Sequence, residues 1–157
     1  MEARLNPFAN PVLGRIFKHL IAANKELANT TLPLSTQELV KLRASQINGC
    51  GFCTDMHFKD AVAAGETPER LNLVAAWREA TVFTDAERAA LELAEEGTRI
   101  ADAAGGVPDE VWANAAKHYD EDQLAALVGV ITIINAFNRG NVLLQTPAGD
   151  YRPGQFG

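Results

Sequence analysis

The chain has 157 residues, of which 47% are apolar and 22% are charged, and its formal net charge is −6. This length predicts a single domain over residues 1–157, with an N-terminal arm at 1–10 and a C-terminal tail at 146–157. The acidic balance argues against a nucleic-acid-binding protein and against docking on an anionic membrane, because both need a basic surface.

The sequence predicts neither an export signal at the N-terminus nor a membrane-spanning helix in its most apolar run. The N-terminal residues contain no apolar stretch followed by a cleavage site. The most apolar run, Leu124 to Phe137, has 14 residues, fewer than a membrane-spanning helix needs. We therefore expect a cytoplasmic protein. Thiols stay reduced in that compartment, so a lone C-x-x-C indicates redox activity or metal binding.

Helical spacing of apolar residues predicts six to seven helices, and no segment alternates as a strand would. The fold class is therefore all-α. Ser35 and Thr84 are each followed three residues later by a glutamate, which is the pattern of a capping box at a helix start. The expected helices cover about 12–27, 35–48, 50–65, 67–77, 84–104, 108–115 and 120–140.

The last of these helices is apolar almost all round, from Leu124 to Phe137, and Gly140 is its expected end. A helix of this kind is buried on both faces, in the core or against another subunit. We therefore expect a homo-oligomer. Trp77 and Trp112 are expected in the core.

Both cysteines lie in the segment Gly49-Cys50-Gly51-Phe52-Cys53-Thr54-Asp55-Met56-His57. If the chain is helical from Cys50 onward, at about 100° per residue, then Cys50, Cys53 and His57 fall within a wedge roughly 60° wide. Two thiols and an imidazole then share one helix face, which is typical of a redox site.

Peroxide chemistry at cysteine needs a thiolate, a second thiol that captures the sulfenic acid, and a group that moves protons. Cys50 and Cys53 supply the dithiol, and His57 exchanges protons near neutral pH. The helix dipole favours a thiolate at Cys50, whereas the i,i+4 contact with His57 favours one at Cys53. We give more weight to His57 as a direct proton partner, and so expect the thiolate on Cys53.

The pattern continues upstream, because Glu38 precedes Cys50-x-x-Cys53-x-x-x-His57 with eleven residues between Glu38 and Cys50. It resembles the active-site signature of AhpD-like alkyl hydroperoxidases, which belong to the carboxymuconolactone decarboxylase superfamily. The resemblance covers roughly residues 10 to 142 and implies a single-domain AhpD-like helical bundle. It includes the segments Gln46-Ile47-Asn48-Gly49, Ala64-Gly65-Glu66-Thr67, Ala76-Trp77-Arg78-Glu79, Phe83-Thr84-Asp85-Ala86-Glu87-Arg88 and Ile134-Asn135-Ala136-Phe137-Asn138-Arg139.

This resemblance implies a thiol-dependent alkyl hydroperoxide reductase. Cys53 would be the peroxidatic thiol and Cys50 its disulfide partner, His57 would activate Cys53, and Glu38 would join the proton relay through water. It implies no metal or organic cofactor, a small-molecule peroxide as substrate, and a reducing dithiol protein or small thiol as partner. It also implies a homo-oligomer, a trimer or hexamer. Phe52 departs from the family, whose founding peroxidase has a histidine before the second cysteine.

Other interpretations of these residues stay open. A C-x-x-C can bind zinc, although that needs four ligands, or the two cysteines can be buried and inert. Glu38 can instead be a structural residue that caps the helix start with Ser35 and takes no part in catalysis. Asn135, Asn138 and Arg139 are expected in capping or inter-subunit bonds. At the level of function, the alternatives are a decarboxylase of the same superfamily, whose branch lacks the cysteine pair, and a non-catalytic dithiol sensor or interaction protein.

Overall fold

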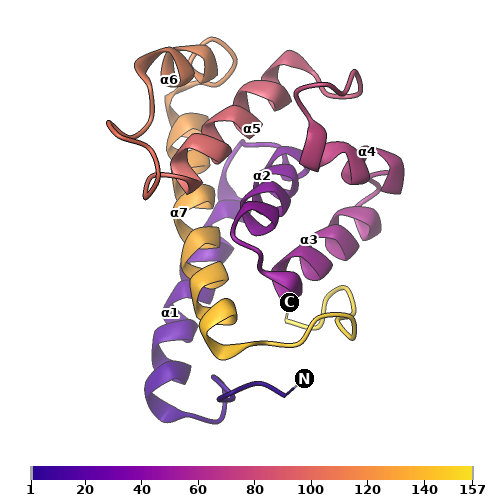
Figure 1. Ribbon diagram of the computed structural model, residues 1–157, viewed down its shortest axis with the longest axis vertical. Helices are drawn as coiled ribbons and strands as arrows, with labels where there is room; N and C mark the ends of the chain where they lie inside the picture. The colour runs from indigo at the N-terminus through magenta and orange to yellow at the C-terminus, as the bar shows by residue number, and fades with distance from the viewer. Residues whose placement is uncertain (1, 157) are drawn as a thin grey trace.

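The computed structural model describes residues 2–156, so Met1 and Gly157, the ends of the predicted arm and tail, lie outside it. Over this range the chain forms seven α-helices and two 3-10 helices (η1 and η2) and no strand, which confirms the all-α prediction (Figure 1). The elements are α1 Pro11–Glu26, η1 Leu27–Asn29, α2 Leu34–Ile47, α3 Gly51–Ala63, α4 Pro68–Asn72, η2 Leu73–Ala76, α5 Asp85–Thr98, α6 Asp109–Ala115 and α7 Glu121–Leu144.

One of the two predicted capping boxes forms. Thr84 accepts a hydrogen bond from the Glu87 backbone N–H, and the Glu87 carboxylate accepts one from the Thr84 N–H, which fixes the start of α5. The box predicted at Ser35 and Glu38 is wrong. Helix α2 begins one residue earlier, at Leu34 after Pro33, without a side-chain cap. Glu38 is therefore free to bond elsewhere.

Helix α2 lies at the centre of the molecule, between α3, α5 and α7 (Figure 1). Its residues 36–42 are all buried, including four with polar or charged side chains, Thr36, Gln37, Glu38 and Lys41. Polar groups buried in this way must find hydrogen-bond partners. The Gln37 amide, for example, donates to the carbonyls of Leu27 and Leu32.

Helix α7 is longer than predicted. It passes Gly140 and runs to Leu144, where Gln145 adopts a left-handed conformation (φ 53°) and ends it. Gly140 does not end the helix. It allows α7 to pack closely against α1, because a Cβ at this position would lie 2.8 Å from Cζ of Phe17. Among residues 2–156, α7 is the one helix long and apolar enough to cross a membrane by length and composition.

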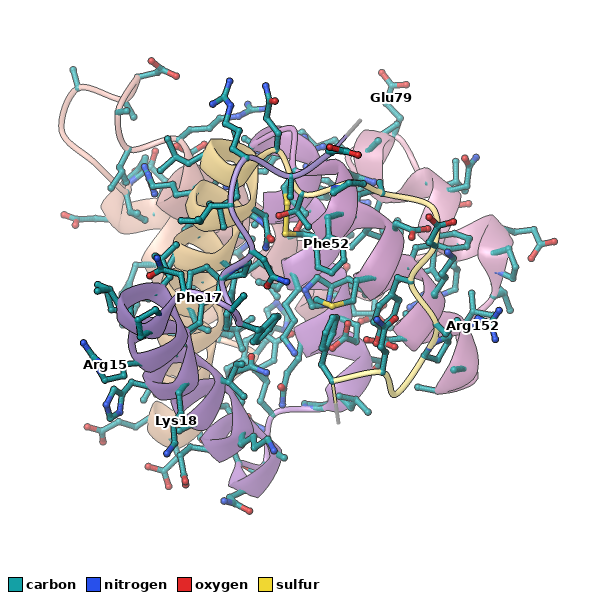
Figure 2. All side chains as sticks on the ribbon, turned by 90° about the horizontal axis from the view of Figure 1, so that it is seen from below. Arg15, Phe17, Lys18, Phe52, Glu79 and Arg152 are labelled. Carbon is teal, nitrogen blue, oxygen red and sulfur yellow. A yellow bond between two sulfur atoms is a disulfide. The ribbon has the colours of Figure 1, made fainter. Side chains whose placement is uncertain are left out.

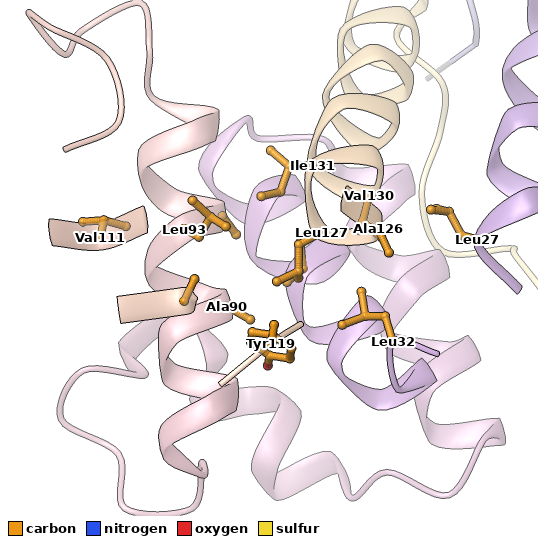
Figure 3. Packing of buried hydrophobic residues seen from close by; sticks show 13 residues of the cluster. Leu27, Leu32, Ala90, Leu93, Val111, Tyr119, Ala126, Leu127, Val130 and Ile131 are labelled. Atoms are coloured by element: carbon orange, nitrogen blue, oxygen red, sulfur yellow. The ribbon is translucent and has the colours of Figure 1, made fainter. Parts of the chain in front are cut away.

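The buried side of α7 forms the main hydrophobic core with α5, α6 and the turn after α1 (Figure 3). The buried members are Leu27, Leu32, Val40, Ala90, Leu93, Ala94, Val111, Ala115, Tyr119, Ala126, Leu127, Val130 and Ile131. Burial on both faces of α7 is not seen within the single chain, because Val128, Val142 and Leu143 are exposed.

A second cluster fills the space between α2, α3 and the segment from α4 to α5, and it holds α3 against α2. It consists of Leu39, Leu42, Ala61, Leu71, Val74, Trp77, Phe83 and Leu91. Trp77 is buried as predicted, but Trp112 is 45% exposed on α6, so its placement in the core was wrong. Beside this cluster, Glu95 accepts hydrogen bonds from Trp77, Arg43 and Arg78.

Candidate active site

The turn between α2 and α3 places the cysteines. Gly49 adopts φ +65°, and the N–H groups of Gly49 and Cys50 bond to the carbonyls of Gln46 and Ser45, which is the Schellman pattern at the end of α2. The Asn48 amide donates to both Asn135 and Asn138 of α7, at 2.9 Å each. These two asparagines thus tie α7 to the turn within one chain, where sequence reasoning expected capping or inter-subunit bonds.

Cys50 and Cys53 are joined by a disulfide, with their Cα atoms 5.4 Å apart. Helix α3 starts at Gly51, one residue later than predicted, and Cys50 is its N-cap. The Cys50 sulfur accepts a hydrogen bond from the Cys53 N–H at 3.3 Å. Both residues are buried, with Cys50 2% and Cys53 0% exposed. A peroxide therefore reaches either sulfur only after a local opening.

His57 follows Cys53 by one turn of α3, and its Nδ1 lies 2.9 Å from Oε2 of Glu38. The other carboxylate oxygen of Glu38 accepts from Lys41 Nζ, also at 2.9 Å. Glu38, Lys41 and His57 are each less than a tenth exposed. The structure thus brings Glu38 and His57 into direct contact, whereas sequence reasoning expected water between Glu38 and the relay.

Electrostatics keep Glu38 ionised. Burial disfavours its charged form, but the hydrogen bond and charge of His57, together with the charge of Lys41, outweigh that effect and lower the pKa to about 2. An ionised Glu38 can only accept, so Nδ1 of His57 carries the proton. The lone pair of a neutral His57 is then at Nε2, which is the atom that can take a proton from a thiol.

Two residues near the site were missed by sequence reasoning. Lys41 could have been found, since it stands three residues after Glu38 and shares its helix face. Asn141 could not, because it lies 88 residues from Cys53 on another helix. Its Nδ2 approaches the Cys53 sulfur at 3.5 Å and also donates to the carbonyl of Phe137 at 3.1 Å.

Residues 146–156, called here the C-terminal segment, fold back along α3 toward its N-terminal end (Figure 1). Lys59 donates to the carbonyls of Gly149 and Tyr151, at 2.9 and 3.0 Å. The Tyr151 hydroxyl donates to Asp60 at 2.8 Å; burial followed by this bond raises the tyrosine pKa to about 12. Burial also raises the pKa of Asp60. The predicted tail is therefore a bound segment.

Phe52, the residue immediately before Cys53, packs under this segment. Its ring centroid lies 6.2 Å from that of Tyr151 and 6.2 Å from that of Phe156. Figure 2 shows Phe52 within the arc that the C-terminal segment describes around this end of α3. Phe52 thus anchors the C-terminal segment through aromatic contacts.

A groove of about 670 Å³ lies beside the turn. It is lined by Leu42, Ser45, Gln46, Gly49, Gly51, Thr54, Asp55, Phe58, Leu71, Asn72 and Ala75. This size suits a small ligand, but neither cysteine is part of its lining. As for metals, residues 2–156 hold no group of three or more His, Cys, Asp and Glu side chains placed to bind one.

Two sequence comparisons relate this chain to known proteins. A model of the carboxymuconolactone decarboxylase family matches residues 13–96. The uncharacterized protein YdfG of Bacillus subtilis is 40% identical over 127 residues, which cover 81% of this chain and 85% of that protein.

Solved structures with the same fold have varied descriptions. A protein of unknown function from Agrobacterium tumefaciens, described as a candidate antioxidant defence protein AhpD, has a TM-score of 0.87 at 32% identity, over 96% of this chain and 100% of that one. The apo debrominase Bmp8 has a TM-score of 0.78 at 20% identity, over 92% of this chain and 75% of that one. At that identity the second likeness concerns the fold alone.

Proposed function

The chain belongs to the carboxymuconolactone decarboxylase family, with an AhpD-like fold, and on that premise we propose that it is a thiol-dependent alkyl hydroperoxide reductase. The observation that carries the proposal is the bonded pair Cys50–Cys53, one helical turn before a histidine that an ionised glutamate holds in one tautomer. That set supplies a nucleophile, a resolving thiol and a proton carrier.

The first half-reaction oxidises Cys53. In the reduced enzyme, Nε2 of His57 takes the thiol proton, and the Cys53 thiolate attacks the terminal oxygen of the hydroperoxide. The O–O bond breaks, and the leaving alkoxide receives the proton from His57 and departs as the alcohol. Cys53 is left as a sulfenic acid. Glu38 stays ionised and stabilises the imidazolium that forms in between.

The second half-reaction restores the dithiol. The Cys50 thiolate attacks the Cys53 sulfur, the hydroxyl leaves as water with one proton, and the disulfide forms. A dithiol carried by a protein, or a small thiol, then reduces the disulfide by exchange. We propose that this takes place in the cytoplasm and in a homo-oligomer, a trimer or hexamer, without metal, organic cofactor, nucleic acid or membrane.

The burial of both sulfurs favours one second candidate, a dithiol sensor that is oxidised once and not turned over. A sensor tolerates a slow opening step, whereas an enzyme must open in every cycle. Steady-state peroxide consumption with a small dithiol present separates the two: an enzyme consumes peroxide much faster than the dithiol does alone, whereas a sensor with a slow opening step does not.

The assignment of roles is tested with single serine variants. Cys53→Ser should abolish peroxide consumption and sulfenic acid formation. Cys50→Ser should react once and keep or over-oxidise its sulfenic acid, because the resolving thiol is gone. His57→Ala should slow that first reaction, since the proton acceptor is removed. A sulfenic acid trapped on Cys50 in the Cys53→Ser variant would reverse the roles of the two cysteines.

A further inference from the structure

The Cys53 sulfur is buried at the contact between α3 and α7, and the side chain of Asn141 reaches it from α7. Cys53 has no exposed surface, so no water solvates its sulfur in this state. A thiolate in such a place is disfavoured by burial unless hydrogen-bond donors face it. The Asn141 Nδ2, 3.5 Å from the sulfur, is a donor from outside the motif.

The orientation of the Asn141 amide is fixed by a second bond. Nδ2 also donates to the carbonyl of Phe137, one turn earlier on α7, at 3.1 Å. The flipped amide would set two acceptor oxygens against each other, so the N–H side must face the sulfur. Helix α7 is tied to the motif's own turn through the hydrogen bond from Asn48 to Asn138, which holds the helix that carries Asn141 beside α3.

The two sulfurs differ in what stabilises their charged forms. The Cys50 sulfur accepts a hydrogen bond from the Cys53 backbone N–H at the start of α3, where the helix dipole also favours negative charge. Cys53 has His57 one turn away and the Asn141 amide beside it. Four other titratable groups lie on this side of the molecule. Glu38 on α2 bonds to His57 and to Lys41, and Asp60 bonds to Tyr151.

From this arrangement we propose that Asn141 is a catalytic residue that donates its amide N–H to the Cys53 sulfur and so places the reactive thiolate on Cys53. This rests on the proposed function for its role in peroxide reduction. The same bond acts in the reductive step. When an external thiolate attacks the Cys50 sulfur, a mixed disulfide forms on Cys50 and Cys53 leaves as a thiolate, which the amide receives.

The test measures the pKa of each thiol alone, from the ultraviolet absorbance of the thiolate during a pH titration. In the Cys50→Ser protein, Asn141→Ala should raise the pKa of Cys53 by about one unit, a tenfold change in the ionisation constant. Asn141→Asp keeps the size but turns the donor into a charged acceptor, so it should raise that pKa further. Val142→Ala, an exposed neighbour on the same helix, is the matched control.

The second cysteine supplies an internal control. In the Cys53→Ser protein, Asn141→Ala should leave the pKa of Cys50 within about a twofold change in ionisation constant. Equal shifts at both cysteines would mean that the substitution only disturbs packing, and no shift at Cys53 would mean that the amide does not act on it. Either result overturns the proposal.

Thiol exchange gives an independent readout. Oxidised protein treated with limiting glutathione and then trapped should carry the mixed disulfide mainly on Cys50, and Asn141→Asp should move a measurable share of it to Cys53. An unchanged distribution would contradict the role of Asn141. None of these measurements uses peroxide. A chain that failed as a peroxidase would thus still return a result on Asn141, and the two failures can be told apart.

Discussion

Replacement of Glu38 by glutamine should destabilise the fold in a pH-dependent manner. The pKa of Glu38 is about 2 in the folded chain against an ordinary value of 4.5. That difference of about 2.5 units, at about 1.4 kcal/mol each, corresponds to about 3 kcal/mol of folding free energy. Because Glu38 is buried, solvent screening reduces this free energy only slightly.

The sign follows from proton binding. A carboxylate with a lowered folded pKa stabilises the fold fully above about pH 4.5 and loses that contribution as the pH falls toward about 2. Glutamine cannot ionise, and it leaves the buried Lys41 without an anion. Near neutral pH, Glu38→Gln should therefore unfold with a free energy about 3 kcal/mol lower than the natural chain.

The assay is urea unfolding of both oxidised proteins between about pH 6 and about pH 3, where the stability difference should narrow by about 2 kcal/mol. Glu79→Gln is the control, since Glu79 is exposed and points away from the body in Figure 2; its difference from the natural chain should stay small and constant. A Glu38→Gln difference that did not change with pH would refute an ionised Glu38 and, with it, the assigned tautomer of His57.

Three further substitutions test the packing around the site. Glu95→Ala removes the buried acceptor of three donors and should lower the unfolding free energy by about 3 kcal/mol in a urea titration; a loss under about 1 kcal/mol would show that these bonds are not formed. Gly140→Ala brings a Cβ within 2.8 Å of Phe17 Cζ and should destabilise by about 1–3 kcal/mol; a raised melting temperature would mean that α1 moves aside freely. Tyr151→Phe removes a hydrogen bond that lowers the pKa of Asp60, so that pKa, followed by NMR titration, should rise. An unchanged value would contradict the bound C-terminal segment.

Features set by neighbouring residues could be predicted from the sequence. The Thr84 capping box forms as expected because both of its bonds join residues three apart. The placing of Cys53 and His57 one turn apart on α3 likewise follows from helical spacing, whereas Cys50 is the N-cap of α3 and has an extended backbone. The all-α class rests on the same local periodicity, which recurs in each of the expected helices.

Features set by distant partners could not be predicted. The Ser35–Glu38 pattern is locally equivalent to the Thr84 box, but the Glu38 carboxylate bonds to His57, 19 residues away on α3, and no local rule weighs this competitor. Gly140 resembles a helix stop, and only its contact with Phe17 explains why a glycine stands there. Asn141 meets Cys53 across 88 residues, a distance at which periodicity carries no information.

The bound C-terminal segment has a practical consequence for handling this chain. Phe156, near its end, lies 6.2 Å from Phe52 between ring centroids, so a purification tag or fluorescent fusion attached there would begin beside the dithiol. Such a fusion would pull the segment from α3 or crowd the opening that a reductant needs. The loop between α5 and α6 lies at the other end of the molecule (Figure 1), and its tip at residues 104–105 is exposed. Loop tips of this kind tolerate insertions, which makes it the better place for a label in redox assays.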